Sequence, residues 1–458
     1  MKTKRKNKLS PTQIIALGFL ITILVGSMLL MLPISRTRNY SYLDSIFTAT
    51  SATCVTGHST IDAAKDLTIF GQVILMLLIQ IGGLGFILVF ALFLLIFGKK
   101  ITLKNRILIS QSVSKDGFEG IVKLLHKIIK YTFSIELIGA FVLAIGFSKE
   151  YSLGQSLYYG LFHSISSFCN AGFDILPGDS LIPYAFNRAI IIPLMILIQI
   201  GGLGFLVWDD ISKACYAAFI ERKGFWKSMR KLNLHTKIVV VMQVFLVLFG
   251  TFAFLGLEYQ NPETIANITF NDKLLLASFH SVSARTAGFA SLNMMKLNIP
   301  TKLFMIFLML IGGAPGSMAG GLKTVTLMVI VFAMLAIIKG KKNITVFHRT
   351  VPRETYEKAC TVFLIMFVMT YLSMVIVMCN LNQPMNSLDV LFDNASSIAT
   401  VGLSTGALQN MNPVSILTTL FLMFIGRVGT ITTALVFLID RPRENDEIVY
   451  AHENVIVG

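Results

Sequence analysis

The sequence predicts an all-α integral membrane protein made of four pseudo-repeats of helix–pore loop–helix around one central pore. Three observations carry this prediction. Hydrophobic residues make up 54% of the chain and charged residues 14%, apolar runs near the length of a membrane span recur throughout, and one short motif ending in glycine occurs four times. A soluble protein of 458 residues could not cover so apolar a surface with polar groups.

The apolar runs approach the roughly 20 residues that a helix needs to cross a bilayer. The first run is not expected to be a cleaved secretory signal, because it continues directly into the first repeat and has no small-residue cleavage site. We expect spans at about 12–33, 68–97, 128–147, 186–207, 238–257, 303–338, 361–379 and 414–439.

The formal net charge of +15 is distributed as expected for a membrane protein rather than a nucleic-acid-binding one. Of the 39 Lys and Arg residues, 28 fall in alternate loops, 8 in the opposite loops and 3 within apolar segments. The loops rich in Lys and Arg lie at 2–8, 99–130, 213–237, 339–358 and 441–443. By the positive-inside rule, the chain is a multi-pass protein with both termini in the cytoplasm. Membrane lipids with anionic headgroups account for the charge without nucleic acid.

The repeated motif divides the chain into four units of similar length. Its copies are Cys54-Val55-Thr56-Gly57, Cys169-Asn170-Ala171-Gly172, Arg285-Thr286-Ala287-Gly288 and Ala399-Thr400-Val401-Gly402. Consecutive glycines, at positions 57, 172, 288 and 402, are 115, 116 and 114 residues apart. Four equivalent backbone segments in one polypeptide can surround a single axis. We therefore predict pore repeats at 1–115, 116–232, 233–345 and 346–458.

Each unit reads as a helix, a re-entrant segment too short to span the membrane, and a second helix. Asp44, Asp272 and Asp389 stand where three of the short helices should begin, as N-caps would. The negative end of each short helix then points at the motif and favours a cation there. Glycine tolerates positive φ, which lets successive carbonyls face one axis and replace the hydration shell of an ion. We expect the sixteen motif residues to form an ion filter; the alternative, that glycine merely turns the chain, is disfavoured by four copies in register.

A second feature repeats with the same period. Residues 78–86 and 197–205 are identical, Leu-Ile-Gln-Ile-Gly-Gly-Leu-Gly-Phe, and weaker copies follow at 311–313 and 425–429. The small residues predict close approach between helices.

The third copy departs from this pattern in a way that predicts a break in the helix. Five glycines and a proline within ten apolar-flanked positions cannot stay regularly helical. Arg427 stands at the matching point of the fourth repeat, and an intramembrane cation should face a cavity or bind backbone carbonyls. We expect a gate formed by Arg427 with Gly312, Gly313, Ala314, Pro315, Gly316, Ser317, Met318, Ala319, Gly320 and Gly321. The alternative is a packing kink beside an arginine that reaches toward the membrane surface.

Four helix–pore loop–helix units in one chain, each with one filter glycine, resemble the Trk/Ktr/HKT superfamily of potassium transporters. The number of spans is closest to the membrane subunit of bacterial Ktr systems. This resemblance implies potassium uptake across the bacterial cytoplasmic membrane, with K⁺ held by the filter carbonyls and no covalent cofactor. It also implies a homodimer, a cytosolic nucleotide-binding ring as regulatory subunit and, in some members, Na⁺ as an activator.

One residue departs from the family pattern. His58 follows the first filter glycine, where members usually carry an apolar or aromatic residue. We expect its ring at the outer mouth, beside the ion path, where protonation would repel cations.

Three alternatives differ in what they require of the sequence. A sodium-dependent or mixed Na⁺/K⁺ transporter would share the fold, but glycine at all four filter positions favours potassium, since in the superfamily a serine at the first position accompanies sodium transport. A membrane-embedded enzyme should cluster acidic or His residues, and these are scattered here, so we expect no enzyme. A passive scaffold would not need four filter-like glycines.

Overall fold

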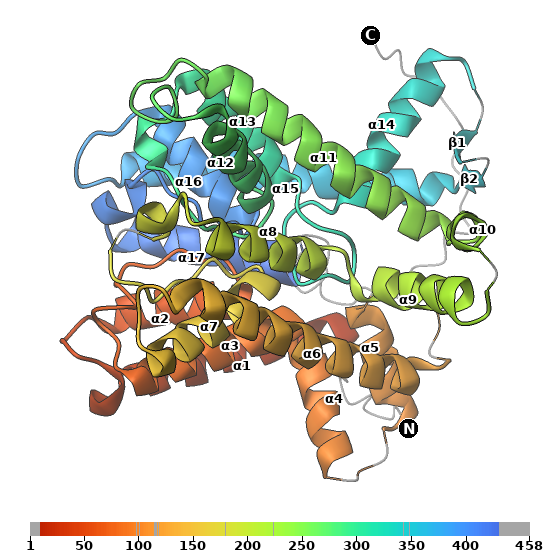
Figure 1. Cartoon of the computed structure of the whole chain (residues 1–458), viewed down its shortest axis with the longest axis horizontal. Coiled ribbons are helices and arrows are strands. Elements are labelled where there is room, and N and C mark those ends of the chain that lie inside the picture. The colour runs from red at the N-terminus through yellow and green to blue at the C-terminus, as the bar shows by residue number, and fades with distance from the viewer. Residues whose placement is uncertain are drawn as a thin grey trace, which may run out of the picture.

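The computed structural model describes residues 10–429, apart from positions 98, 100, 114–116, 118, 179, 223, 342 and 348. The described chain is helical except for its connections and one short antiparallel hairpin, β1 (Ile344–Val346) with β2 (Arg349–Val351). The long helices α1, α6, α11 and α15 cross the molecule from the end that carries the short helices to the end that carries α4, α9 and the hairpin (Figure 1).

The helices fall into four sets with the same order: a long helix, a short helix that ends at a glycine motif, and a further helix. The first set is α1 (Pro11–Leu30), η1 (Pro33–Ser35), α2 (Tyr42–Cys54), α3 (Ile69–Leu84), α4 (Phe86–Ile96) and α5 (Leu103–Ser112). The second set is α6 (Ile121–Phe147), α7 (Leu153–Phe168), η2 (Ile182–Tyr184), α8 (Arg188–Gly202), α9 (Phe205–Phe219) and α10 (Phe225–Arg230).

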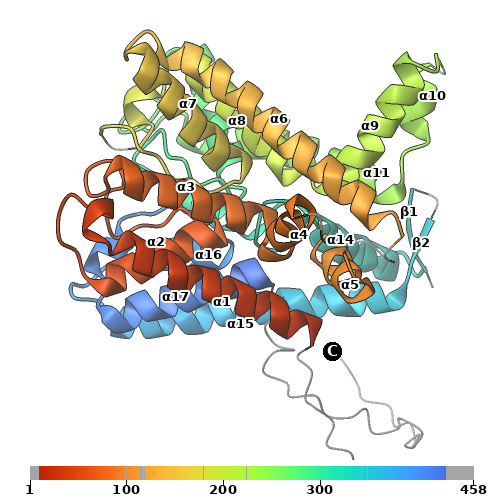
Figure 2. The same cartoon turned by 90° about the horizontal axis from the view of Figure 1, so that it is seen from below.

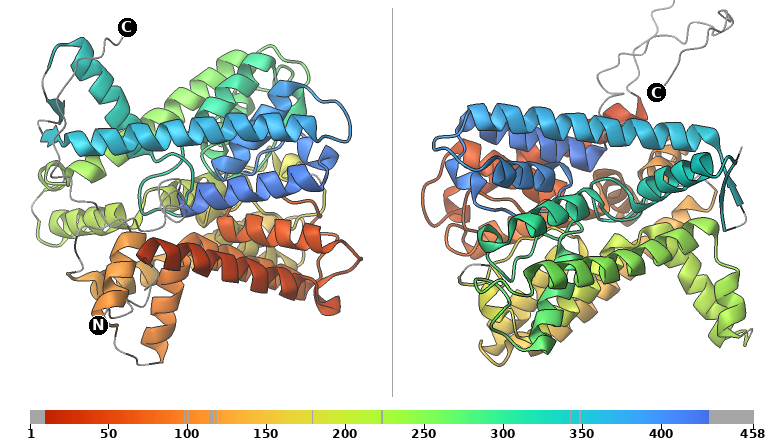
Figure 3. Two further views of the ribbon diagram at one scale, coloured as in Figure 1. Left: turned by 180° about the vertical axis from the view of Figure 1, so that it is seen from behind. Right: turned by 90° about the horizontal axis from the view of Figure 1, so that it is seen from above.

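The other two sets repeat this order, with the hairpin between them. The third is α11 (Leu234–Glu258), α12 (Phe270–Ser283), η3 (Met294–Lys296), α13 (Ile299–Leu310) and α14 (Thr324–Ile338). The fourth is α15 (Arg353–Cys379), α16 (Ser387–Ile398), η4 (Ala407–Asn410) and α17 (Pro413–Val428). Figure 3 shows α15 along one face of the molecule, with α17 beside it.

The short helices α2, α7, α12 and α16, called the pore helices below, close the four sets into a ring. Each packs against the long helix of its own set and against the post-motif helix of the preceding set: α2 on α17, α7 on α3, α12 on α8 and α16 on α13. The first set therefore contacts the fourth as the others contact their neighbours. Side chains of the pore helices are mostly buried, whereas α6 and α11 expose large apolar side chains such as Ile145 (70%) and Phe252 (65%), as lipid-facing helices do.

Four described helices, α1, α6, α11 and α15, are long and apolar enough to cross a membrane, and six spans result if each of two bent pairs counts as one. The expected span at 414–439 is described only as far as Gly429. The spans expected at 68–97 and 186–207 are each made of two helices, because α3 turns into α4 by 98° and α8 into α9 by 102°. Figure 2 shows α9 leaving the body of the molecule after this bend. The bends fall at Gly85 (φ 85°) and Gly204 (φ 92°), a conformation that glycine adopts without a Cβ clash.

Candidate functional site: a ring of four glycines

The four motif glycines form a closed ring, called the glycine ring below. A Cβ added to Gly57 would come within 3.0 Å of the carbonyl oxygen of Ala171, the residue before Gly172. A Cβ on Gly172 would meet the Ala287 oxygen in the same way, one on Gly288 the Val401 oxygen, and one on Gly402 the Thr56 oxygen. Each motif thus abuts the next, and the fourth abuts the first. Motifs more than 110 residues apart are brought into one site with fourfold pseudosymmetry.

The motifs share one backbone conformation. The glycines have φ between 70° and 98°, and the residue two positions before each glycine also has positive φ: Val55 (58°), Asn170 (60°), Thr286 (72°) and Thr400 (51°). A non-glycine residue, and a β-branched one above all, is rarely left-handed, and the strain is of order 1–3 kcal/mol each. Strain at four equivalent positions indicates that this backbone shape is required by what the site does.

The pore helices place the motifs. The expected caps Asp44, Asp272 and Asp389 are wrong by three residues, because the N-caps are Ser41, Thr269 and Asn386 and each aspartate lies in the first turn. Ser41 and Asp44 form a reciprocal capping box. The aspartates still lie at the positive end of the helix dipole, so the negative end of each helix points at its motif.

Serine side chains near the end of each pore helix hold the motif backbone, and sequence reasoning missed them. Ser51 Oγ accepts a hydrogen bond from Gly57 N at 3.1 Å, and Ser396 Oγ accepts one from Gly402 N at 3.0 Å. Ser166 Oγ donates to Phe173 O at 2.7 Å, and Ser283 Oγ donates to Phe289 O at 2.6 Å. The recurrence of serine five or six residues before each glycine was a signal that could have found them.

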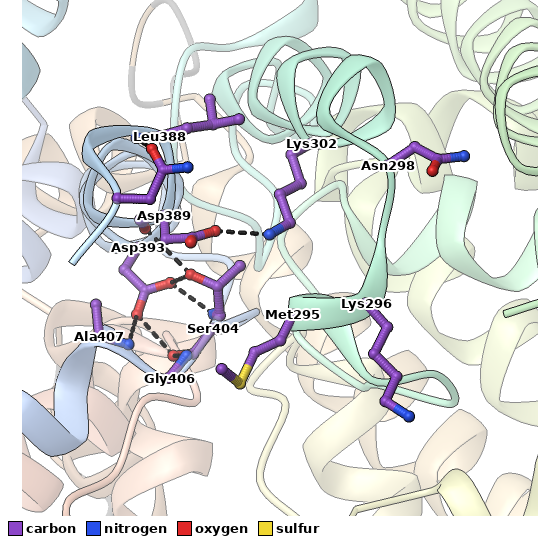
Figure 4. A network of polar contacts seen from close by, with 12 residues as sticks. Met295, Lys296, Asn298, Lys302, Leu388, Asp389, Asp393, Ser404, Gly406 and Ala407 are labelled. Carbon is purple, nitrogen blue, oxygen red and sulfur yellow. Dashed lines mark hydrogen bonds and ion pairs between the residues drawn. The ribbon is translucent and has the colours of Figure 1, made fainter. Parts of the chain in front are cut away.

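Behind the fourth motif, the buried Asp393 anchors the chain that leaves the glycine ring (Figure 4). Its carboxylate accepts hydrogen bonds from Ser404 Oγ (2.6 Å), Thr405 N (2.7 Å), Thr405 Oγ1 (3.0 Å) and Ala407 N (3.1 Å). In the same view Lys302 Nζ on α13 lies 2.7 Å from Asp389 Oδ1 on α16, tying the third set to the fourth. A carboxylate that accepts four hydrogen bonds fixes a loop more rigidly than packing of the loop's short side chains could.

We expected the His58 ring at the outer mouth, but it is buried between the first and fourth motifs (1% exposed). Its Nδ1 lies 3.1 Å from Ser397 Oγ, and its Nε2 lies 3.2 Å from Ser396 Oγ and 3.1 Å from Leu403 O. Phe289 follows the third glycine and packs against His163 of the preceding pore helix in the same manner. His58 therefore fills the space between the first and fourth repeats and joins them by hydrogen bonds.

We expect His58→Ala to destabilise the protein, because it leaves a gap and removes hydrogen bonds from two buried serines. The free energy of unfolding should fall by about 1–3 kcal/mol, measured as a lower midpoint of thermal unfolding in detergent. His126→Ala is the matched control, since His126 is exposed on α6. Equal midpoints for the two variants would contradict the inter-repeat role of His58.

The Arg285 side chain points away from the motif and into the protein. It is buried (4% exposed), and its guanidinium donates to Gln243 Oε1 on α11 and Gln199 Oε1 on α8, each at 3.0 Å. Between the first and second sets, Gln80 Nε2 on α3 donates to the Glu136 carboxylate on α6 at 3.0 Å. Polar contacts of this kind join consecutive sets where the helices are otherwise apolar.

The segment 312–321 forms the break that we predicted between α13 and α14. It lies against the bend of the second set: Ala314 N donates to Gly202 O at 3.0 Å, and Phe205 N donates to Gly316 O at 2.9 Å. Arg427 Nη1 donates to Met318 O in this segment, and its Nη2 donates to Gly82 O and to Gly83 O on α3. Lys323 Nζ donates to Ala319 O at 2.6 Å.

A cavity of about 330 Å³ lies beside this segment. Its walls include Gly83, Ser317, Ala319, Lys323 and Arg427, together with residues at the bends of the first and second sets and at the end of α17. The 312–321 segment and two cationic side chains thus line one cavity at the point where α3 and α8 end. The close-approach prediction for the Gly-Gly motif is confirmed, because a Cβ at Gly82, Gly201 or Gly426 would collide with the carbonyl at the end of a pore helix.

Short helices that converge on a ring of left-handed glycines, inside a chain with membrane-length apolar helices, define a membrane transport protein. The chain belongs to the TrkH family of cation transport proteins, whose family model matches residues 4–447. This membership bears out the expected superfamily, and its members are transport proteins rather than enzymes.

Similar proteins align along the whole chain. It is 36% identical to the potassium/sodium uptake protein NtpJ of Enterococcus hirae, covering 100% of this chain and 99% of that protein. It is 34% identical to the Ktr system potassium uptake protein B of Bacillus subtilis, covering 98% of this chain and 97% of that protein. The crystal structure of the potassium transporter TrkH from Vibrio parahaemolyticus superposes with a TM-score of 0.71 at 18% identity, covering 96% of this chain and 87% of that one, so the fold is shared.

Proposed function

We propose that the chain takes up potassium across the bacterial cytoplasmic membrane, and that the glycine ring is its selectivity filter. The observation that carries the proposal is the ring itself, in which each glycine abuts the carbonyl before the next one. Backbone carbonyls from residues 54–57, 169–172, 285–288 and 399–402 replace the hydration shell of K⁺. The relatives named as potassium uptake proteins support potassium as the cargo.

The 312–321 segment is the gate in this proposal. Its glycines keep two backbone arrangements close in energy, which a switch requires. Arg427 holds the segment through Met318 O and places a cation at the cavity that K⁺ must cross.

The chain works within a larger assembly. Relatives are named as parts of a Ktr system, which supports a system of more than one component. In this proposal the chain forms a homodimer and a cytosolic nucleotide-binding ring is its regulator. The four pore repeats extend over 1–115, 116–232, 233–345 and 346–458. Both termini lie in the cytoplasm, on the side of the basic loops.

A second candidate function is sodium-dependent or mixed Na⁺/K⁺ transport, favoured by the 36% identity to a protein named for potassium and sodium uptake. Flux into proteoliposomes separates the two. Potassium transport predicts Rb⁺ uptake without Na⁺ and no ²²Na⁺ uptake, Na⁺ activation predicts Rb⁺ uptake that rises with Na⁺, and mixed transport predicts uptake of both ions.

Growth rescue tests the proposed cargo and regulation together. A bacterium deficient in potassium uptake should grow at low K⁺ when it carries this chain, and grow faster when a cytosolic nucleotide-binding partner is added. The same strain with Gly402→Ser is the matched control, since this change disturbs the ring at one point. Absence of growth with and without the partner, although the chain reaches the membrane, would overturn the proposal.

A further inference from the structure

The α9–α10 hairpin carries a basic pocket that the transport path does not use. The pocket has a volume of about 200 Å³ and is lined by Asp210, Lys213, Ala214, Ala217, Lys227, Ser228, Lys231 and Leu232. Figure 1 places the hairpin at the end of the molecule that also holds α4, α5 and β1–β2, away from the pore helices α2, α12 and α16.

Three polar groups of this pocket, Lys227, Ser228 and Lys231, have no ion pair or side-chain hydrogen bond within the described residues. Ser228 lines the pocket and is 5% exposed, and its hydroxyl has no hydrogen-bond partner in the part of the chain that the structure describes. Within the described residues, Lys227 and Lys231 form no ion pair. Burying a hydroxyl without a partner is unfavourable, so a ligand with acceptor oxygens would stabilise this site.

Acidic side chains near the pocket are already engaged. Asp209 pairs with Lys127 and Lys213, each at 2.5 Å, and Asp210 accepts a hydrogen bond from Asn233 N at 2.9 Å. The Asp209 carboxylate offsets the charge of Lys213 in part, whereas Asp210 keeps its negative charge, because its partner is a neutral backbone N–H. The lining still has three lysines against one aspartate. The free charge of the pocket is therefore positive, and an anion fits it.

The tip of the hairpin is aromatic and exposed. Phe219 is 72% exposed and Trp226 78%, and Phe225 lies between them with ring centroids 6.5 Å from Phe219 and 5.7 Å from Trp226. Aromatic side chains beside lysines are typical of the membrane–water interface, where rings sit at headgroup depth and lysines meet anionic lipid. Figure 2 shows the hairpin projecting from the helical body, so its tip is free to meet lipid.

We propose that the α9–α10 hairpin binds the headgroup of an anionic phospholipid, with its phosphodiester on Lys227, Lys231 and Ser228 and its acyl chains along Phe219, Phe225 and Trp226. A second copy of the chain does not fit as the occupant, because a twofold contact would place lysines against lysines. The inference needs a chain embedded in a membrane and does not depend on potassium as the cargo.

The two tryptophans of the chain make the site directly observable. Trp208 is buried (8% exposed) and Trp226 is exposed at the site. The difference in emission between the wild type and Trp226→Phe therefore reports Trp226 alone. In nanodiscs of phosphatidylcholine, a small fixed fraction of brominated phosphatidylglycerol should quench this signal more than the same fraction of brominated phosphatidylcholine.

The double variant Lys227→Gln/Lys231→Gln tests the pocket without touching buried residues. The preference for phosphatidylglycerol should fall about fivefold for each lysine removed, and about 30-fold for the pair. Lys339→Gln/Lys341→Gln removes equal charge beside α14 and should leave the preference unchanged. Equal quenching by the two lipids in the wild type would overturn the proposal, as would an equal loss in both double variants. Release of the quenching by millimolar inorganic phosphate would show that the pocket takes free phosphate rather than lipid.

Discussion

Gly57→Ser is expected to lower discrimination between K⁺ and Na⁺ by about tenfold or more. Two costs add at this position. The backbone has φ 97°, where a side chain costs about 1–2 kcal/mol, and the new Cβ would come within 3.0 Å of the Ala171 oxygen. Because that oxygen belongs to the next motif, the strain must displace a carbonyl of the ring. A loss of about 1.4 kcal/mol in differential binding corresponds to a factor of ten.

The measurement is uptake of Rb⁺ and of ²²Na⁺ into proteoliposomes at matched reconstitution. Gly154→Ser is the control, because nothing lies within 4 Å of a Cβ at Gly154 and its φ is ordinary. Gly402→Ser should resemble Gly57→Ser, since its Cβ would meet the Thr56 oxygen of the first motif. If serine at both ring positions leaves uptake and selectivity as they are in Gly154→Ser, the filter assignment is wrong.

The four-unit organisation could be predicted because it is written as a period in the sequence. Glycines 114–116 residues apart define the units, and a proline with five glycines marks the break at 312–321. The 98° and 102° bends at Gly85 and Gly204 were missed because their flanks are as apolar as a straight span. A single glycine in such a run is compatible with a continuous helix, and only the packing of neighbouring sets decides between the two.

The contacts between repeats could not be predicted from the sequence, for a different reason. Glu136 clearly needed a partner, yet Gln80 lies 56 positions away on another helix. The sequence predicts His58 at the outer mouth, whereas its ring contacts Ser396 and Ser397 of the fourth pore helix. Such pairings depend on the order of the repeats around the ring, which a one-dimensional pattern does not fix.

Arg427→Ala is expected to raise ion flux by about tenfold while preserving the preference for K⁺ over Na⁺. The guanidinium holds Met318 O of the 312–321 segment and Gly83 O of α3, so its loss frees the segment. It also removes a charge from the cavity wall. At about 5 Å and an effective dielectric constant of about 20, two unit charges repel by about 3 kcal/mol. Water and carbonyl groups in the cavity weaken this repulsion. A remaining contribution of about 1.4 kcal/mol to the activation free energy would suffice for a tenfold change in rate.

Flux into proteoliposomes containing equal amounts of protein is the decisive measurement for this variant. Arg353→Ala is the control, because it removes the same charge outside the cavity. Arg353 is exposed at the start of α15, where it pairs with Glu357. Deleting residues 313–320 should reproduce the rise in flux, since it removes the obstruction itself. The two changes act on different atoms, so agreement between them points to one gate. Lower flux with lost selectivity in either variant would instead mark the segment as a support for the glycine ring above it, and the gate would have to be sought elsewhere along the cavity.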